Sequence, residues 1–390
     1  MLVTRVIGDC PECKRSACFG NVDIHADHVL RGCKFCKYSA RVYLPPVRKA
    51  LLYLDQFFFS GAFRGGDRRF VDAAARVRGL ADKQLLVSPF SSVHEDETHL
   101  WARRLELYEF IKAASRGHEF QPAYEIEREQ ILNGFEAWLA NKPANYSCDR
   151  RQALWHDVDQ WDGYFRIDVG RYMGDIDVIR ASKQQSISDL VDAFPEWRRS
   201  SNTFEQDVAV ELHASGRSYF EAYIKYVMRI GSGDYSALID SPIISMIVQH
   251  MLHYLPNEMA PEDQLRKCGK FFNSQHFAAL PYQDIEARAC ATLKAQVKAG
   301  AYSNRDVALE KLRGFFYDLK HVATYAPYCQ AFVMDQPMAA LMAQPGIALE
   351  RRYGVRVFSL NNWDEFTAWL DGLEERMSDE HRAGLRVVYP

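Results

Sequence analysis

The sequence has little net charge and no long hydrophobic run, and each shortage excludes a class of protein. Its 390 residues include 48 basic and 51 acidic side chains, so a net charge of −3 demands no nucleic-acid partner. No stretch approaches the roughly 18 uncharged apolar residues of a membrane-spanning helix. The longest uncharged run, residues 241–257, contains two histidines and predicts a buried helix. Hydrophobic residues at 48% and charged residues at 25% exclude disordered and collagen-like chains.

The sequence also lacks the marks of a secreted protein. The start, MLVTRVIGDC, has no apolar segment that would serve a signal peptide. Nine cysteines, an odd number with five in the first 36 residues, do not suit a disulfide framework. We therefore expect a cytoplasmic protein with reduced thiols and no membrane association. The length predicts two or three domains, and no internal repeat is apparent.

Charge is unevenly distributed along the chain. Residues 1–50 contain nine basic and four acidic side chains, an excess of +5. Because the total is −3, residues 51–390 carry −8. A basic head and an acidic body of this kind predict separate tasks.

Two Cys-x-x-Cys pairs, separated by 19 residues, lie in the basic head. This spacing is typical of a structural zinc ribbon, in which each pair presents two sulfurs to one tetrahedral ion and no position remains for water. Cys18, His25 and His28 lie between the pairs, and we expect surface or packing roles for them, although an exchanged ligand stays open. Zinc and four thiolates together add −2, so the head keeps +3, and its partner can be phosphates or a protein. The predicted zinc ligands are Cys10, Cys13, Cys33 and Cys36.

After Pro45-Pro46 the pattern becomes that of an α/β protein. Four short, continuously apolar segments predict buried parallel strands, while residues 121 to about 300 show almost only helix periodicity. Strands from both ends of the chain should therefore share one sheet, interrupted by a large all-helical insertion. The predicted strands are Ala50–Leu54, Leu85–Ser88, Ala331–Met334 and residues 355–360. The expected parts are the zinc ribbon (1–45), the α/β domain (46–120 and 305–390) and the helical insertion (121–304).

Acidic side chains follow two of these strands. Asp55 comes directly after the first strand and Asp335 after the third. Parallel strands end at one edge, where ligands bind, and two carboxylates there call for a cation such as Mg2+ or Mn2+. An aspartate at a strand end can also simply cap the next helix. The HEDETH segment (94–99) spaces its histidines by five residues rather than four, which excludes a zinc-protease helix.

Three segments, YLDQ, SSVHEDET and DLKHVATYAPYCQAFVMDQPMAALM, resemble those of PIN-like nucleases, over about residues 46–115 and 305–370. The resemblance implies a small PIN-like parallel sheet flanked by helices, with acids clustered at its carboxyl edge. It assigns four catalytic Mg2+ or Mn2+ ligands, with Glu95 as an alternative to the second: Asp55, Glu97, Asp318 and Asp335. Gln330 stands where the family usually has aspartate, which would weaken the site if that position were a ligand.

The resemblance implies a metal-dependent endonuclease, a phosphodiester hydrolase acting on RNA rather than DNA. Such nucleases often serve as toxins or defence effectors, and the helical insertion would then bind a regulatory protein or a second copy. The basic ribbon or the Arg64–Arg78 segment would attract phosphates, and Phe57–Phe59 would stack on a base. The alternative is a catalytically inactive PIN-like adaptor that binds nucleic acid or a partner protein.

Overall fold

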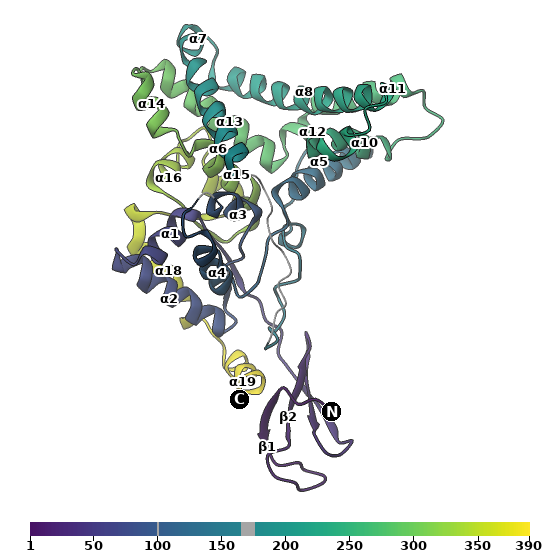
Figure 1. Ribbon diagram of the computed structural model, residues 1–390, viewed down its shortest axis with the longest axis vertical. Helices are drawn as coiled ribbons and strands as arrows, with labels where there is room; N and C mark the ends of the chain where they lie inside the picture. The colour runs from purple at the N-terminus through teal and green to yellow at the C-terminus, as the bar shows by residue number, and fades with distance from the viewer. Residues whose placement is uncertain (100, 165–175) are drawn as a thin grey trace.

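The computed structural model describes residues 1–99, 101–164 and 176–390. It is elongated, with a small β-sheet at one end, an α/β core in the middle and a long helical arm at the other end (Figure 1). None of the helices within these ranges is long and apolar enough to cross a membrane.

The N-terminal unit is a four-stranded antiparallel sheet of order β1-β2-β3-β4. Gly20 permits the close approach of the first two strands, since a Cβ there would lie 1.9 Å from the Arg5 carbonyl oxygen. The unit packs on the C-terminal helix, because Asn21 Nδ2 donates to the carbonyl oxygens of Val387 and Val388 at 3.2 and 3.1 Å. Its strands are β1 (Arg5–Gly8), β2 (Phe19–Ile24), β3 (His28–Cys33) and β4 (Ser39–Tyr43).

The central sheet is parallel, with order β6-β5-β7-β8, and it joins strands from both ends of the chain as predicted. Alternate residues face two different cores: Leu51 and Tyr53 lie in one, Leu52 and Leu54 in the other. Burial of both faces explains why the strands are continuously apolar. The strands are β5 (Ala50–Leu54), β6 (Leu86–Val87), β7 (Ala331–Val333) and β8 (Arg356–Phe358).

Helices cover both faces of this sheet. One face packs against α1 (Gln56–Arg64), α2 (Arg68–Asp82), α4 (Arg104–Ser115) and α18 (Trp363–Glu375). The other face packs against α3 (Ser92–Thr98), α5 (Ala123–Leu139), α6 (Ile176–Asp192), α7 (Phe194–Arg199), α13 (Pro281–Lys298), α14 (Arg305–Lys311), α15 (Phe315–Tyr325), α16 (Gln336–Met342) and α17 (Leu349–Tyr353). The chain ends in α19 (Asp379–Val388), and short 3-10 turns are η1 (Arg150–Gln152), η3 (Ala326–Tyr328) and η4 (Leu360–Asn362).

The expected insertion, 121–304, is rich in helices, although its residues 165–175 lie outside the described part. Its inner helices share the core of the sheet, and its outer ones form a third core around the end of α5. The arm of Figure 1 consists of α8 (Phe204–Gly231), α9 (Ala237–Asp240), η2 (Ile243–Met246), α10 (Ile247–Leu252), α11 (Pro261–Phe272) and α12 (Gln275–Ala278).

Two predicted helices differ in detail. The uncharged run 241–257 does not form one buried helix: it holds two short helices, η2 and α10, and Ile243 is 55% exposed. The periodicity of residues 306–319 predicts one helix, but the structure breaks it at 312–314, between α14 and α15.

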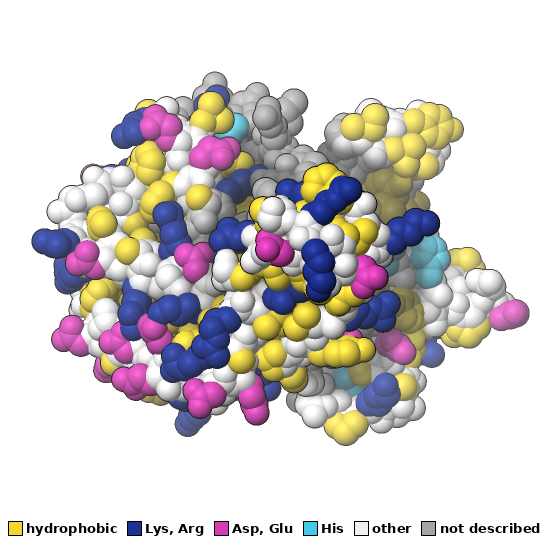
Figure 2. All heavy atoms as spheres, turned by 90° about the horizontal axis from the view of Figure 1, so that it is seen from below, with side chains coloured by type: hydrophobic (Ala, Val, Ile, Leu, Met, Phe, Trp, Pro, Cys, Tyr) yellow, Lys and Arg dark blue, Asp and Glu magenta, His cyan; other side chains and the backbone are white. Residues whose placement is uncertain are grey.

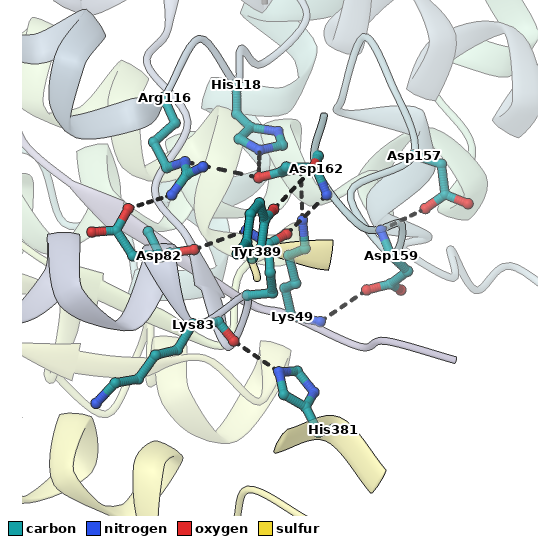
Figure 3. A network of polar contacts seen from close by, with 12 residues as sticks. Lys49, Asp82, Lys83, Arg116, His118, Asp157, Asp159, Asp162, His381 and Tyr389 are labelled. Atoms are coloured by element: carbon teal, nitrogen blue, oxygen red, sulfur yellow. Dashed lines mark hydrogen bonds and ion pairs between the residues drawn. The ribbon is translucent and has the colours of Figure 1, made fainter. Parts of the chain in front are cut away.

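A buried polar network lies at the amino end of β5 (Figure 3). Lys49 Nζ lies 2.8 Å from Asp162 Oδ1, with their side chains 1% and 9% exposed. His118 Nε2 lies 3.2 Å from Asp162 Oδ2, and Tyr389 donates to the Asp162 carbonyl oxygen at 2.8 Å. The network therefore ties the first strand of the sheet to residues near 160 and to the C-terminus.

Candidate functional site

The four predicted zinc ligands converge at one end of the N-terminal sheet. The Sγ atoms of Cys10 and Cys36 are 3.7 Å apart, and those of Cys13 and Cys33 are 3.8 Å apart. Two sulfurs of a tetrahedral centre with Zn–S bonds of about 2.3 Å lie about 3.8 Å apart. Within the described residues, these cysteines are the only group of three or more possible ligands whose ligand atoms all lie within 4.8 Å. The cluster can therefore hold a metal ion such as zinc.

The surroundings of the cluster favour thiolate at one ligand. Burial tends to raise the pKa of Cys33, but the backbone N–H groups of Phe35 and Cys36 donate to its sulfur and lower that pKa to about 6. Cys18, which sequence analysis left outside the ligand set, is fully buried with its Sγ 3.5 Å from that of Cys33. Burial and the Cys33 thiolate raise the pKa of Cys18 to about 11, so it lies beside the centre as a neutral thiol.

The predicted acidic residues lie at the carboxyl edge of the parallel sheet. Asp55 follows β5 and caps α1, accepting a 2.6 Å hydrogen bond from the Phe57 amide. Asp335 follows β7 and caps α16, accepting a 2.8 Å hydrogen bond from the Met338 amide. Since Leu54 pairs with Val333 in the sheet, the two aspartates end neighbouring strands. Both are therefore caps, as the simpler interpretation held, and also members of one cluster.

Electrostatics link all four predicted acids. Burial raises the pKa of Asp55 well above its ordinary value, since this side chain is only 4% exposed. The negative charges of Asp318, Glu97 and Asp335 raise it further. Burial also raises the pKa of Asp335, and the charge of Glu97 adds to this effect. Asp55 thus lies within electrostatic reach of the other three carboxylates, and Asp335 within reach of Glu97, although among the described residues no three of these acids have ligand atoms that all lie within 4.8 Å of one another.

Glu97 is held by a buried chain of hydrogen bonds that the sequence did not reveal. Its Oε2 lies 3.2 Å from His321 Nε2, so this nitrogen carries the proton and donates. The other ring nitrogen of His321 contacts the Tyr53 hydroxyl, which in turn lies 2.7 Å from Ser91 Oγ. Tyr53 is fully buried in β5, and a hydroxyl in an otherwise aliphatic strand, ALLYL, is the one signal that could have identified the chain.

The position of Glu97 in α3 excludes the simpler interpretation that this acid only complements the helix dipole. An acid in the first helical turn would do no more than complement the helix dipole, but Glu95 is the first-turn acid of α3. Glu97 is the next-to-last residue of that helix, where a negative charge is unfavourable. The alternative, Glu95, accepts a 2.5 Å hydrogen bond from Tyr108. Glu97 is thus the better member of the cluster.

Asp318 lies in the first turn of α15 and folds back over Gly314. A Cβ added at Gly314 would lie 2.7 Å from Asp318 Oδ2. The residue before the helix must therefore be small for the carboxylate to occupy this position.

The donor set fits a hard divalent cation. The buried carboxylate of Asp55 is destabilised by the charges of the three other acids unless a cation or protons neutralise them. Next to Asp55, the Gln56 side chain is 7% exposed and donates through Nε2 to Thr98 Oγ1 at 3.1 Å. Its Oε1 has no hydrogen-bond partner among the described residues, so a buried oxygen remains beside the acids.

Two other sequence-based candidates lie elsewhere. Gln330 precedes β7, and its Oε1 accepts a 2.6 Å hydrogen bond from the Leu51 amide at the amino end of β5. It is therefore at the opposite edge of the sheet from Asp335. Phe58 and Phe59 are 1% exposed and pack in the core, so they cannot stack on a base.

Comparison of the chain with protein-family models, with curated proteins and with solved structures finds no significant match. The site must therefore be interpreted from its own geometry.

Proposed function

We propose that the protein is a metal-dependent nuclease of the PIN-like type, acting on RNA rather than DNA in the cytoplasm. The observation that carries this proposal is that Asp55 and Asp335 end neighbouring parallel strands, with Glu97 and Asp318 close enough for their charges to act on Asp55. In open α/β sheets this edge is where ligands bind. The proposed ligands of one or two Mg2+ or Mn2+ ions are Asp55, Glu97, Asp318 and Asp335.

Each side chain has a defined task in this proposal. The chemistry that the ions supply is a lower pKa for the attacking water and stabilisation of the leaving oxygen of a phosphodiester. Asp55 and Asp335 are fixed by their capping hydrogen bonds, which orient one carboxylate oxygen and leave the other for a ligand. His321 orients Glu97 by donating to its Oε2. Until metal binds, the acidic edge repels phosphates.

The inactive adaptor receives no support from Gln330. That alternative rested on loss of an aspartate from the metal site. Because Gln330 bridges β5 and β7 at their amino ends, an aspartate there would not reach the carboxylate cluster. Its substitution is therefore compatible with a complete set of ligands.

The test removes the charge of each strand-end aspartate while it keeps the hydrogen bond that caps the following helix. Asn caps helices about as well as Asp, so Asp55→Asn and Asp335→Asn keep the fold and remove the charge. We expect cleavage of single-stranded RNA with Mn2+ to fall at least about a hundredfold in each variant. Asp67→Asn is the matched control, because Asp67 caps α2 through the Arg69 amide at 3.0 Å away from the cluster. Equal cleavage by all four proteins would refute the nuclease proposal.

A further inference from the structure

We propose that single-stranded nucleic acid binds to the metal-bearing end of the N-terminal sheet, with a base stacked on Phe35 and phosphates on the surrounding cations. This surface is separate from the carboxylate edge, and binding to it does not require cleavage. The four cations are Lys14, Arg15, Lys34 and Lys37.

The aromatic ring is presented to solvent by the cysteine turn. Phe35 lies between two metal-ligand cysteines, and its amide donates to Cys33 Sγ at 3.3 Å, so the backbone is fixed by the cluster. The side chain is 62% exposed. The Arg15 guanidinium lies 4.9 Å from the ring centroid, on one face. A single exposed aromatic residue is unremarkable, but one whose backbone is fixed by the cysteine turn and whose ring lies beside a cation is suited to binding unpaired bases.

The cations near Phe35 lie beside a zinc–thiolate centre that would carry −2, and they are exposed rather than held in ion pairs among the described residues. Lys14, Arg15, Lys34 and Lys37 are all exposed, and none forms an ion pair within the part of the chain that the structure describes. Of the nearby acids, Asp9 accepts a hydrogen bond from the Ala17 amide at 2.9 Å, and Glu12 is exposed. Unpaired cations release counterions when they meet phosphates, which is the main source of affinity for nucleic acid.

The rival basic segment is engaged elsewhere. Three of the five arginines between Arg64 and Arg78 form ion pairs in the described residues, and Arg64 lies over the Trp101 ring at 4.6 Å, much as Arg15 lies over that of Phe35. The ion pairs are Arg68 with Asp72, Arg69 with Asp67, and Arg76 with Asp371. The structure thus distinguishes two candidates that composition left equal, and it favours the N-terminal sheet.

The surroundings favour a single strand over a duplex or a protein. A duplex keeps its base faces stacked, so an exposed ring between cations finds no partner in it. Figure 2 looks at the molecule from the end that carries this sheet, and basic, acidic and hydrophobic side chains are mixed on that face. The sheet is anchored to the body through Asn21 and Arg31, so its metal-bearing end is left as the accessible end.

The experiment measures binding without cleavage, in full-length protein that carries Asp55→Asn. Fluorescence anisotropy with a labelled 12-nucleotide RNA gives the Kd, and metal content is measured for every variant. Phe35→Ala should weaken binding about tenfold, as expected for loss of one stacked base, whereas Phe35→Tyr should retain it. Tyr43→Ala is the matched control, because Tyr43 is 73% exposed and pairs with His28 at the opposite end of β3. Lys34→Gln with Lys37→Gln should reduce the salt slope by about 1.4.

The outcomes separate this proposal from the nuclease proposal. An unchanged Kd for Phe35→Ala with full metal content overturns the stacking surface, whatever the cleavage assay gives. Equal affinity for duplex and single-stranded RNA also overturns the proposal. So does a lack of oligonucleotide binding at 50 mM salt, which would point to a protein partner instead. The same measurement with single-stranded DNA shows whether the sugar contributes to the affinity. If the binding behaves as proposed but wild-type protein does not cleave, only the nuclease proposal fails.

Discussion

Asp55 illustrates how one side chain serves both local structure and the site. Its Oδ1 accepts from the Phe57 amide and starts α1, while its burial among other acids raises its pKa. Capping explains why aspartate is tolerated at the strand end, but capping alone favours an exposed residue. Capping does not require the burial of Asp55 or the acids beside it, whereas a functional role accounts for both.

Gly314 allows a sharp prediction about Asp318. Its φ of −93° suits any residue, so Gly314→Ala should fold and keep the free energy of unfolding within about 1 kcal/mol. The new Cβ would lie 2.7 Å from Asp318 Oδ2, so the carboxylate must shift. We expect Mn2+-dependent cleavage to fall about 10- to 100-fold. Cleavage rates and thermal unfolding measured on the same samples check this.

The control for this substitution is another helical glycine with open space around it. A Cβ at Gly79, in α2, meets nothing within 4 Å. Gly79→Ala should leave cleavage unchanged and stabilise the protein by up to about 1 kcal/mol. If Gly314→Ala also leaves cleavage unchanged, the carboxylate of Asp318 does not take part in the reaction.

At the scale of elements, the site arises from repetition of one unit, a buried strand followed by aspartate and a helix. β5 with α1 and β7 with α16 both follow this order. Parallel pairing of the two strands brings the two aspartates to the same edge. The helices α3 and α15 then add Glu97 and Asp318 from the face that contains Tyr53.

The amino edge of the sheet contains a different kind of polar cluster, and its stability should depend on pH. Burial tends to raise the pKa of Asp162, but the hydrogen bond and charge of His118 and the charge of Lys49 hold it well below the ordinary 3.8. A carboxyl with a lowered pKa in the folded state stabilises the protein above its unfolded pKa, and this contribution is lost as the pH falls below that value.

Asp162→Asn should therefore destabilise the protein by about 3–5 kcal/mol at pH 7, because it leaves the Lys49 ammonium buried without its counterion. The difference from wild type should shrink at pH 3. Urea unfolding at both pH values measures it. Asp72→Asn breaks the exposed pair with Arg68 and should change stability by less than about 1 kcal/mol. A small effect of Asp162→Asn at pH 7 would show that the network contributes little.

At the scale of the whole molecule, the N-terminal sheet depends on its metal cluster more than the body does. Around the metal cluster, the core of the N-terminal sheet consists of cysteines with a few aromatic neighbours. The body, in contrast, contains three larger hydrophobic cores. Asn21 and Arg31 connect it to the carbonyl oxygens at the end of α19. Loss of the metal should thus affect the sheet and its contact with α19.

Hydrogen exchange followed by mass spectrometry tests this dependence. After chelation, exchange should increase in residues 5–43 and in α19, while β5 and β7 stay protected, because they lie in the body's own cores. The purified protein should contain about one equivalent of zinc, and Cys33→Ser should lose it. Less than half an equivalent, unaltered by Cys33→Ser, would contradict a structural zinc site.

The sequence predicted the cysteine cluster and the place of two aspartates in the fold, because chain order carried that information. The spacing of the cysteines gave their convergence, and apolar runs gave the strands that place Asp55 and Asp335. The prediction failed for contacts that depend on packing between distant segments. Phe57–Phe59 resembled a stacking surface but are largely core, and Gln330 resembled a lost ligand but bonds at the other edge.

The sequence by itself determined the cysteine cluster, the buried parallel strands and the acids that follow them, because spacing and periodicity act locally. Only the tertiary structure decided which acids share electrostatic contact, which aromatic ring is exposed and which cations remain unpaired. These depend on the neighbours that folding brings from far along the chain, as Tyr53, His321 and Glu97 show. The near-neutral total charge conceals this arrangement, since Arg68, Arg69 and Arg76 form ion pairs whereas the exposed cations of the two cysteine turns form none among the described residues.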